Sequence, residues 1–339
     1  TRPELEGDSV ARREIEGRLR QLRSDMTGLL ADAFASARWY FDGERFESDA
    51  SHGLSPLAST ICDRVFPQVP FIQSELVNRD VLSSNAAKAQ RQLLHRMLTH
   101  ADQPYLSYEG YPADAGLYYT ILVELGLHDR DGAHWGFVSP ERSKSAGATS
   151  LVPLWSATTR LLEEAGDSVS LYDLYDLWRA PPHGMKEGVM PILALAFLLV
   201  NRSRIAVYVQ ETFVPDLNEA GVDEWLQDPR RIKWKWMRVD ASTKLLLEKL
   251  ASRLEAAVGR PVAADPLDSA RALVSHALNM PSWTQRTSRV SERARSVRTL
   301  LLRASDPVKV IFTDLPETLR AREADGLVDA IGDVIAELD

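Results

Sequence analysis

The stretch from Leu171 to Arg238 restricts the fold of this chain more than any other part of the sequence. Apolar residues recur at helical spacing from Ser170 to Trp178 and again from Lys186 to Asn201, with a Pro-Pro-His-Gly turn between the two segments. A run rich in β-branched and aromatic residues follows from Arg204 to Val214, which predicts a strand. A second predicted strand begins at Arg231. Two helices followed by a two-stranded hairpin give the outline of a winged-helix-like unit.

The second predicted strand alternates strictly between aromatic or apolar residues and basic ones. Successive side chains of a strand point to opposite faces, so one face would pack on a core and the other would form a row of cations. Such a row can contact the phosphate backbone of DNA without reading its sequence. The candidate phosphate contacts are Arg231, Lys233, Lys235 and Arg238.

The composition of the helix predicted from Lys186 to Asn201 argues against recognition of a DNA sequence by this helix. It contains the longest apolar run of the chain, Val189 to Val200, and we expect it to be buried on most sides. A helix that lies in a DNA groove needs an exposed polar face. Two interpretations therefore stay open: the unit contacts DNA through its basic row, or it serves only to pack against other parts of the protein.

Helical patterns dominate the rest of the chain, so the sequence predicts a mainly α protein. A long amphipathic helix is expected within residues 9–41, with an apolar stripe that packs on its neighbours. The glycine-containing segment from His128 to Ala148 is the clearest candidate boundary. The predicted domains are a helical domain at 1–140, a winged-helix-like domain at 149–240 and a C-terminal helical domain at 241–339.

A second group of basic residues lies in the C-terminal region. Arginines crowd the segment from Ser282 to Arg303, where Glu292 is the only acidic residue. One interpretation is a solvated face whose arginines pair with acidic neighbours, and the other is a patch that contacts phosphate or an acidic partner. The candidate contacts are Arg286, Arg289 and Arg293.

The sequence offers no catalytic constellation. A phosphate-binding loop of the Walker A type needs a Gly-Lys pair, and none occurs. Asp314 follows an apolar run that loosely resembles a Walker B strand, but Asp306-Pro307 in front of it favours the start of a helix. No Cys/His group has the spacing of a zinc site. We therefore predict no catalytic residue, no metal site and no cofactor in this chain.

Composition limits the environment and the partners. The net charge of −8 gives no overall attraction to nucleic acid, so contact with DNA requires a local patch. The single cysteine, Cys62, fits a reducing cytoplasm. The longest apolar run has 12 residues, whereas a membrane-spanning helix needs about 20. We expect a cytoplasmic protein that does not enter a membrane.

Several short blocks together resemble the region downstream of the ATPase core in large bacterial phage-defence P-loop ATPases, of the BREX type and the phage-growth-limitation type. The first block contains Glu75, Asn78 and Arg79, with Ser74 in place of the asparagine expected there. The others are Gly110-Tyr111-Pro112 and the turn that contains Pro182 and Gly184. We expect these motif residues to have structural roles. The resemblance spans residues 35–320.

The resemblance implies a role in antiviral defence as part of a larger ATPase. ATP and Mg²⁺ are then expected only in the rest of that protein, and the Thr at the start of the chain suggests a piece of a longer one. The implied function is regulation of the ATPase and binding of double-stranded DNA or of other proteins of a defence complex. The alternative is a purely structural assembly module that does not bind nucleic acid.

Overall fold

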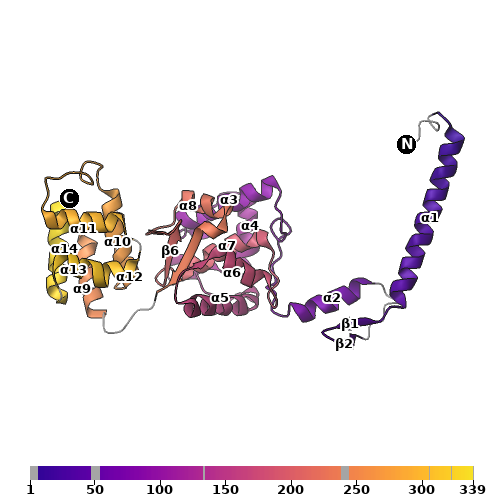
Figure 1. Ribbon diagram of the computed structural model, residues 1–339, viewed down its shortest axis with the longest axis horizontal. Coiled ribbons are helices and arrows are strands. Elements are labelled where there is room, and N and C mark those ends of the chain that lie inside the picture. The colour runs from indigo at the N-terminus through magenta and orange to yellow at the C-terminus, as the bar shows by residue number, and fades with distance from the viewer. Residues whose placement is uncertain are drawn as a thin grey trace. The chain divides into compact units, whose positions relative to one another are not determined.

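The computed structural model describes residues 7–46, 54–132, 134–237, 244–304, 306–321 and 323–338 (Figure 1). It is mainly helical with small antiparallel sheets, as the sequence predicts. Contacts divide the chain into two units, Thr1–Pro67 and Gln68–Asp339.

The first unit contains a long helix, a hairpin and a second helix. These are α1 (Ser9–Ala35), β1 (Trp39–Phe41) paired with β2 (Glu44–Phe46), and α2 (Leu54–Val65). The helix predicted within residues 9–41 therefore ends earlier than expected, and its last residues form a strand. Phe34 stacks on Trp39 with ring centroids 6.1 Å apart, which joins the end of α1 to the hairpin.

The second unit begins with helices that pack on the predicted winged-helix-like unit. The helix α3 (Ser84–Thr99) is capped by Ser83, whose hydroxyl accepts from the backbone N–H of Ala86. The segment predicted as a boundary loop contains a hairpin. In order, the elements after α3 are a 3-10 turn (Pro104–Ser107), α4 (Ala113–Leu117), a π-helical turn (Tyr118–Val123), β3 (His128–Asp131) and β4 (His134–Phe137).

The winged-helix-like unit contains helices around a four-stranded antiparallel sheet of order β5-β8-β6-β7. The segment predicted as one strand from 204 to 214 is a hairpin, and its turn residues Gln210 and Glu211 both have positive φ. A helix, α8, lies between this hairpin and the last strand. The elements are α5 (Val152–Ala165), β5 (Val169–Ser170), α6 (Leu171–Arg179), α7 (Met190–Val200), β6 (Ile205–Val209), β7 (Thr212–Val214), α8 (Glu219–Gln227) and β8 (Ile232–Trp236). Short 3-10 turns at Gly147–Leu151, Glu187–Val189 and Pro229–Arg231 precede α5, α7 and β8.

The helix α7 lies at the centre of this unit, as its apolar composition predicts. Every residue from Met190 to Leu198 is buried. The Phe197 ring meets Trp155 of α5 edge-on at 5.4 Å and stacks on Trp234 of β8 at 6.1 Å. On another side α7 contacts α3. A helix covered in this way cannot enter a DNA groove.

The C-terminal helices form a second core. They are α9 (Lys244–Val258), α10 (Pro266–Asn279), α11 (Glu292–Leu302), α12 (Pro307–Lys309), a π-helical turn (Val310–Asp314), α13 (Leu315–Leu319) and α14 (Ala324–Leu338). Asp265 caps α10 by accepting from the N–H of Asp268 at 2.8 Å. The segment around Asp314 is helical, so it is not the strand that a Walker B motif requires.

Strand β6 belongs to both cores of the second unit. Because side chains alternate along a strand, Ile205 and Val207 pack with the α7 core, whereas Ala206 and Tyr208 pack with the C-terminal helices. Arg271 of α10 adds a polar link. Its guanidinium donates to the carbonyl of Arg202 at 2.6 Å and to that of Ile205 at 3.0 Å, and the residue is 3% exposed.

Burial lowers the pKa of Arg271 to about 10, so the side chain still carries its charge at neutral pH. Replacing it in Arg271→Met leaves both carbonyls without this donor. We expect the free energy of unfolding to fall by about 2–3 kcal/mol, measured by urea denaturation. Arg260→Met is the matched control, because Arg260 pairs with Asp268 at a half-exposed site and should cost under about 1 kcal/mol. Equal losses in the two variants would contradict a structural role for Arg271.

His128 gives the stability of the fold a defined pH dependence. It is buried, its Nε2 lies 2.9 Å from the carbonyl oxygen of Ala101, and its Nδ1 lies 2.9 Å from the hydroxyl of Tyr118. Because a carbonyl only accepts, Nε2 carries the proton and Nδ1 accepts from the tyrosine. Burial lowers the pKa of His128 below its usual 6.5, although the bond to Ala101 acts in the opposite direction.

The unfolded chain therefore takes up a proton near pH 6.5 that folded His128 takes up only at lower pH. Its neutral form contributes stability that is present above pH 6.5 and is lost as pH falls through the folded pKa. We expect urea unfolding at pH 7.5 and 5.5 to show a smaller loss of stability at pH 5.5 for His128→Gln than for the wild type. The difference should be at most about 1.4 kcal/mol per pH unit. The control is His134→Gln, at an exposed position of the same hairpin, and an effect of equal size there would exclude His128 as the source.

Candidate nucleic-acid interface

The basic row of β8 has the alternation that the sequence predicts. Ile232 and Trp234 are buried, whereas Lys233 and Lys235 are partly exposed on the opposite face. Strand β8 lies inside the sheet, between β5 and β6, and Arg231 lies in the short 3-10 turn in front of it.

Each described cation of this row has a carboxylate partner within the chain. Arg231 lies 3.3 Å from Glu224 and 3.6 Å from Asp228, and Lys235 lies 2.9 Å from Asp306. Lys233 forms a salt bridge with Glu211 of the β6–β7 turn. A phosphate would have to displace these carboxylates before it could bind. The fourth predicted contact, Arg238, lies outside the described residues.

The second predicted basic group has different surroundings. Arg286, Arg289 and Arg295 are exposed, and within the part of the chain that the structure describes their side chains form no salt bridge or hydrogen bond. Trp283, in the same segment, is 69% exposed. We name the exposed side chains of Trp283, Arg286, Arg289 and Arg293 the arginine patch. Arg295 lies two residues after Arg293 on α11 and therefore on another side of that helix.

Hydrogen bonds to backbone carbonyls hold the segment that carries the arginine patch in place. Arg298 is buried and donates to the carbonyl of Thr284 at 2.6 Å. Gln285 donates to the carbonyls of Leu278 and Met280 at 2.9 and 3.0 Å. Arg293, the third predicted residue of this group, reaches the carbonyl of Leu319 at 3.4 Å. These bonds fix the backbone while the other arginines point to solvent.

The residues of the first family-like block are exposed. Glu75, Asn78 and Arg79 line a shallow depression of about 580 Å³, and no hydrogen bond or salt bridge joins their side chains to other described residues. The segment forms turns, with the N–H of Asn78 bonded to the carbonyl of Ser74 at 2.8 Å. The structural roles expected for this block therefore lie in its backbone.

The backbones of the first and third blocks meet. The carbonyl of Pro182 accepts from the N–H of Gln68, Gly184 has φ of 61°, and the N–H of Gly188 donates to the carbonyl of Arg79 at 3.0 Å. A Cβ atom at position 188 would lie 2.5 Å from the carbonyl oxygen of Val77. Only glycine allows this approach, so the turn after Pro182 and the segment of Glu75 support each other.

We expect Gly188→Ala to lower the free energy of unfolding by about 2–3 kcal/mol, because backbone atoms must move apart to admit the methyl group. Gly116→Ala in α4 is the control, since nothing lies within 4 Å of a Cβ atom at that position. Thermal denaturation measures both variants, and the control should be neutral or slightly stabilising. A neutral Gly188→Ala would show that the contact is not tight in solution.

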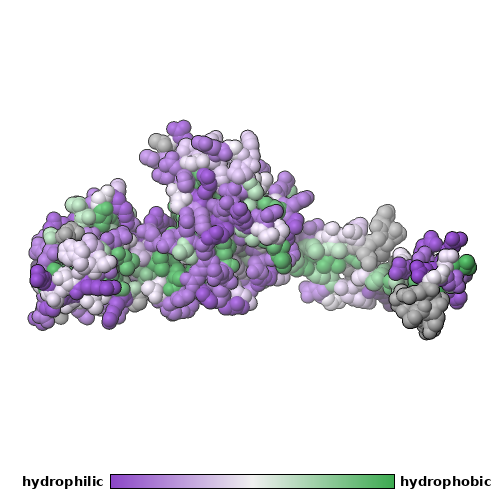
Figure 2. All heavy atoms as spheres, turned by 90° about the horizontal axis from the view of Figure 1, so that it is seen from above, coloured by the Kyte–Doolittle hydropathy of each residue, from purple (hydrophilic) through white to green (hydrophobic). Residues whose placement is uncertain are grey.

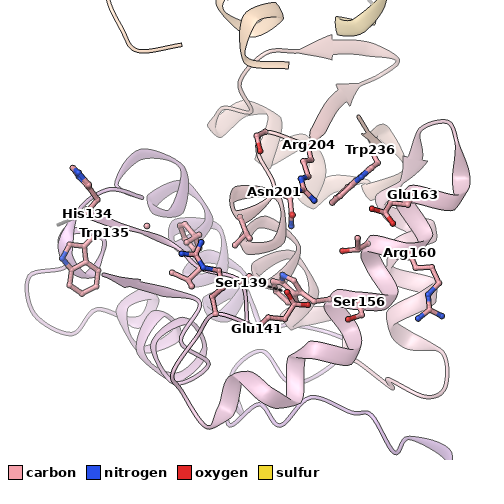
Figure 3. A pocket seen from close by; sticks show the side chains of 18 residues that line it. His134, Trp135, Ser139, Glu141, Ser156, Arg160, Glu163, Asn201, Arg204 and Trp236 are labelled. Carbon is pink, nitrogen blue, oxygen red and sulfur yellow. Dashed lines mark hydrogen bonds between the residues drawn. The ribbon is translucent and has the colours of Figure 1, made fainter. Parts of the chain in front are cut away.

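A cleft of about 870 Å³ lies on the winged-helix-like unit (Figure 3). Its walls come from β4 and the loop after it, from α5, and from the segments where α7 ends, β6 begins and β8 ends. Arg160, Arg204 and Trp236 line it, and the guanidinium of Arg204 lies 5.8 Å from the Trp236 ring. At its floor, Trp155 is buried and its indole N–H has no described partner.

The two carboxylates of the cleft lie on separate elements. Glu141 comes from the loop after β4 and Glu163 from α5 (Figure 3), and Ser139 donates to Glu141 at 3.4 Å. Sequence reasoning did not find this cleft, because its residues come from four separate segments and form no motif.

The described ranges hold no metal cluster and no membrane-spanning helix. No group of three or more His, Cys, Asp or Glu side chains could hold a metal ion there. Among the helices described, none combines the length and the apolar character needed to cross a bilayer. Comparison of the chain with protein-family models, with curated proteins and with solved structures gave no match.

Proposed function

We propose that this chain is a non-catalytic binding segment of a larger bacterial antiviral-defence ATPase and that it holds the phosphate backbone of duplex DNA through the arginine patch. The observation that carries the proposal is the contrast between the two basic groups. Arg231, Lys233 and Lys235 are paired with carboxylates, whereas Arg286 and Arg289 are exposed without one among the described residues. Placement in a defence ATPase rests on the resemblance of the short sequence blocks.

Arginine suits this role because its guanidinium presents several N–H donors to phosphate oxygens in a fixed plane. The exposed ring of Trp283 adds a surface on which a sugar or an unpaired base can rest. Hydrophilic side chains cover most of the visible face of the second unit (Figure 2), and the net charge of the chain is −8. Binding therefore depends on this local patch and should be weak and independent of DNA sequence.

Binding to duplex DNA should depend strongly on salt. Contact with three phosphates gives a slope of about −2.7 in log K against log salt, which is a loss of about 40-fold between 50 and 200 mM salt. We expect Arg286→Gln/Arg289→Gln to reduce that slope by about 2, measured by fluorescence polarisation with a labelled duplex.

Arg231→Gln/Lys233→Gln removes the same number of charges at positions already paired with carboxylates, and it should leave binding nearly unchanged. A larger loss of DNA affinity in this control than in the arginine-patch variant would show that the DNA interface lies at β8 and not at the arginine patch. Thermal denaturation of both variants checks that each is folded.

The second candidate function is a structural assembly module that does not bind nucleic acid. The burial of α7 from Met190 to Leu198 favours it, since the helix that would enter a groove is used for packing. Absence of wild-type binding at 50 mM salt would decide for this function and against the first.

A further inference from the structure

The apolar stripe of α1 has no partner among the described residues of the first unit. Ile15, Leu22 and Leu29 are 43%, 58% and 71% exposed, and Leu19 and Met26 are also exposed. Helices in proteins owe most of their stability to the packing of an apolar face. A helix of 27 residues that leaves such a face open therefore needs something to cover it.

The spacing of the stripe is that of a coiled coil rather than of a helix on a globular core. Its residues follow one another at alternating intervals of four and three over three heptads. Ile15, Leu22 and Leu29 occupy the d positions, and the a positions are Leu19, Met26 and Ala33. Leu30, at an e position, borders this a/d seam and is 50% exposed. A seam of this width fits one facing helix.

The charges beside the seam distinguish the two orientations of a second copy. In a parallel pair each g residue faces the e residue of the next heptad, so Arg18 would face Arg23 of the other copy twice. In an antiparallel pair the a positions pack against d positions. One register places all six apolar residues opposite one another, with Leu19 facing Leu29, Met26 facing Leu22 and Ala33 facing Ile15.

In that register the two ends of the pair are complementary in charge. Residues at g positions face each other, so Arg18 lies beside Asp32 of the second copy at both ends. At the centre of the pair, Asp25 faces Asp25 of the second copy along one edge of the seam. Along the other edge, Arg23 faces Arg23 of the second copy. Two opposite-charge pairs thus offset two like-charge pairs, whereas the parallel arrangement has the like-charge pairs alone.

We propose that α1 joins two copies of this chain as an antiparallel coiled coil through the seam of Ile15, Leu19, Leu22, Met26, Leu29 and Ala33. The proposal does not depend on DNA binding, since it rests on the first unit and the arginine patch lies in the second.

Light scattering after size exclusion, with the full chain, tests the association. We expect a dimer for the wild type and a monomer for Leu22→Asp/Leu29→Asp, which places charges in the seam. Ser24→Asp/Ala31→Asp adds the same charge at the f positions, on the opposite face of the helix, and should remain a dimer. A monomeric wild type at micromolar concentration would overturn the proposal, as would loss of the dimer in both variants.

The orientation is tested by reversing one charge. In the antiparallel pair Arg18→Asp places two aspartates beside each other at both ends, so the dimer dissociation constant should rise about tenfold. The double variant Arg18→Asp/Asp32→Arg should restore it. A parallel pair gives the opposite result, because Arg18→Asp would relieve its contact with Arg23 and tighten the dimer. Sedimentation at several concentrations measures these constants, and a tighter Arg18→Asp dimer would overturn the antiparallel arrangement.

Discussion

The burial of α7 is the interaction on which the rest of the second unit depends. A helix that is apolar on every side must be covered on every side, and α3, α5 and the sheet supply that cover. The helices α3 and α4 and the winged-helix-like unit therefore share one core. The same packing removes from the surface the helix that a DNA-binding winged helix would place in a groove.

Salt bridges to carboxylates distinguish the basic residues beside β8 from those of the arginine patch. Helix α8 and the β6–β7 turn bring Glu224, Asp228 and Glu211 to the cations of β8. Asp223 of the same helix accepts from Arg91 and His95 of α3, and these contacts lower its pKa to about 2. Helix α8 thus supplies carboxylates both to the cations beside β8 and to Arg91 and His95 of α3. The arginine patch lies beyond its reach and keeps its positive charge toward solvent.

Local signals in the sequence predicted much of the fold. Ser170 starts the predicted helix and caps it in the structure, and the alternation after Arg231 gives the burial pattern of β8. The hairpin from His128 to Phe137 was missed although an Asp-Gly pair lies at its turn, because the long polar segment favoured a loop. The turn at Gln210 and Glu211 carries no glycine or asparagine, so nothing local marked it.

The candidate site was less predictable than the fold. The sequence gives the position of each arginine, but only the folded chain shows which of them lies beside a carboxylate. Arg231 and Glu224 are close in sequence, yet Lys235 and Asp306 are 71 residues apart. The cleft beside Trp236 depends on contacts of the same long range.

The position of β6 between two cores has a consequence for how this region can be divided. A recombinant piece that stopped near residue 240 would keep every element of the winged-helix-like unit but would expose Ala206, Tyr208 and Phe213 to water. A piece that began near residue 240 would lack these three side chains, which form part of the core of the C-terminal helices. Neither half is a self-sufficient folding unit, so the C-terminal helices and the sheet should melt in a single cooperative transition.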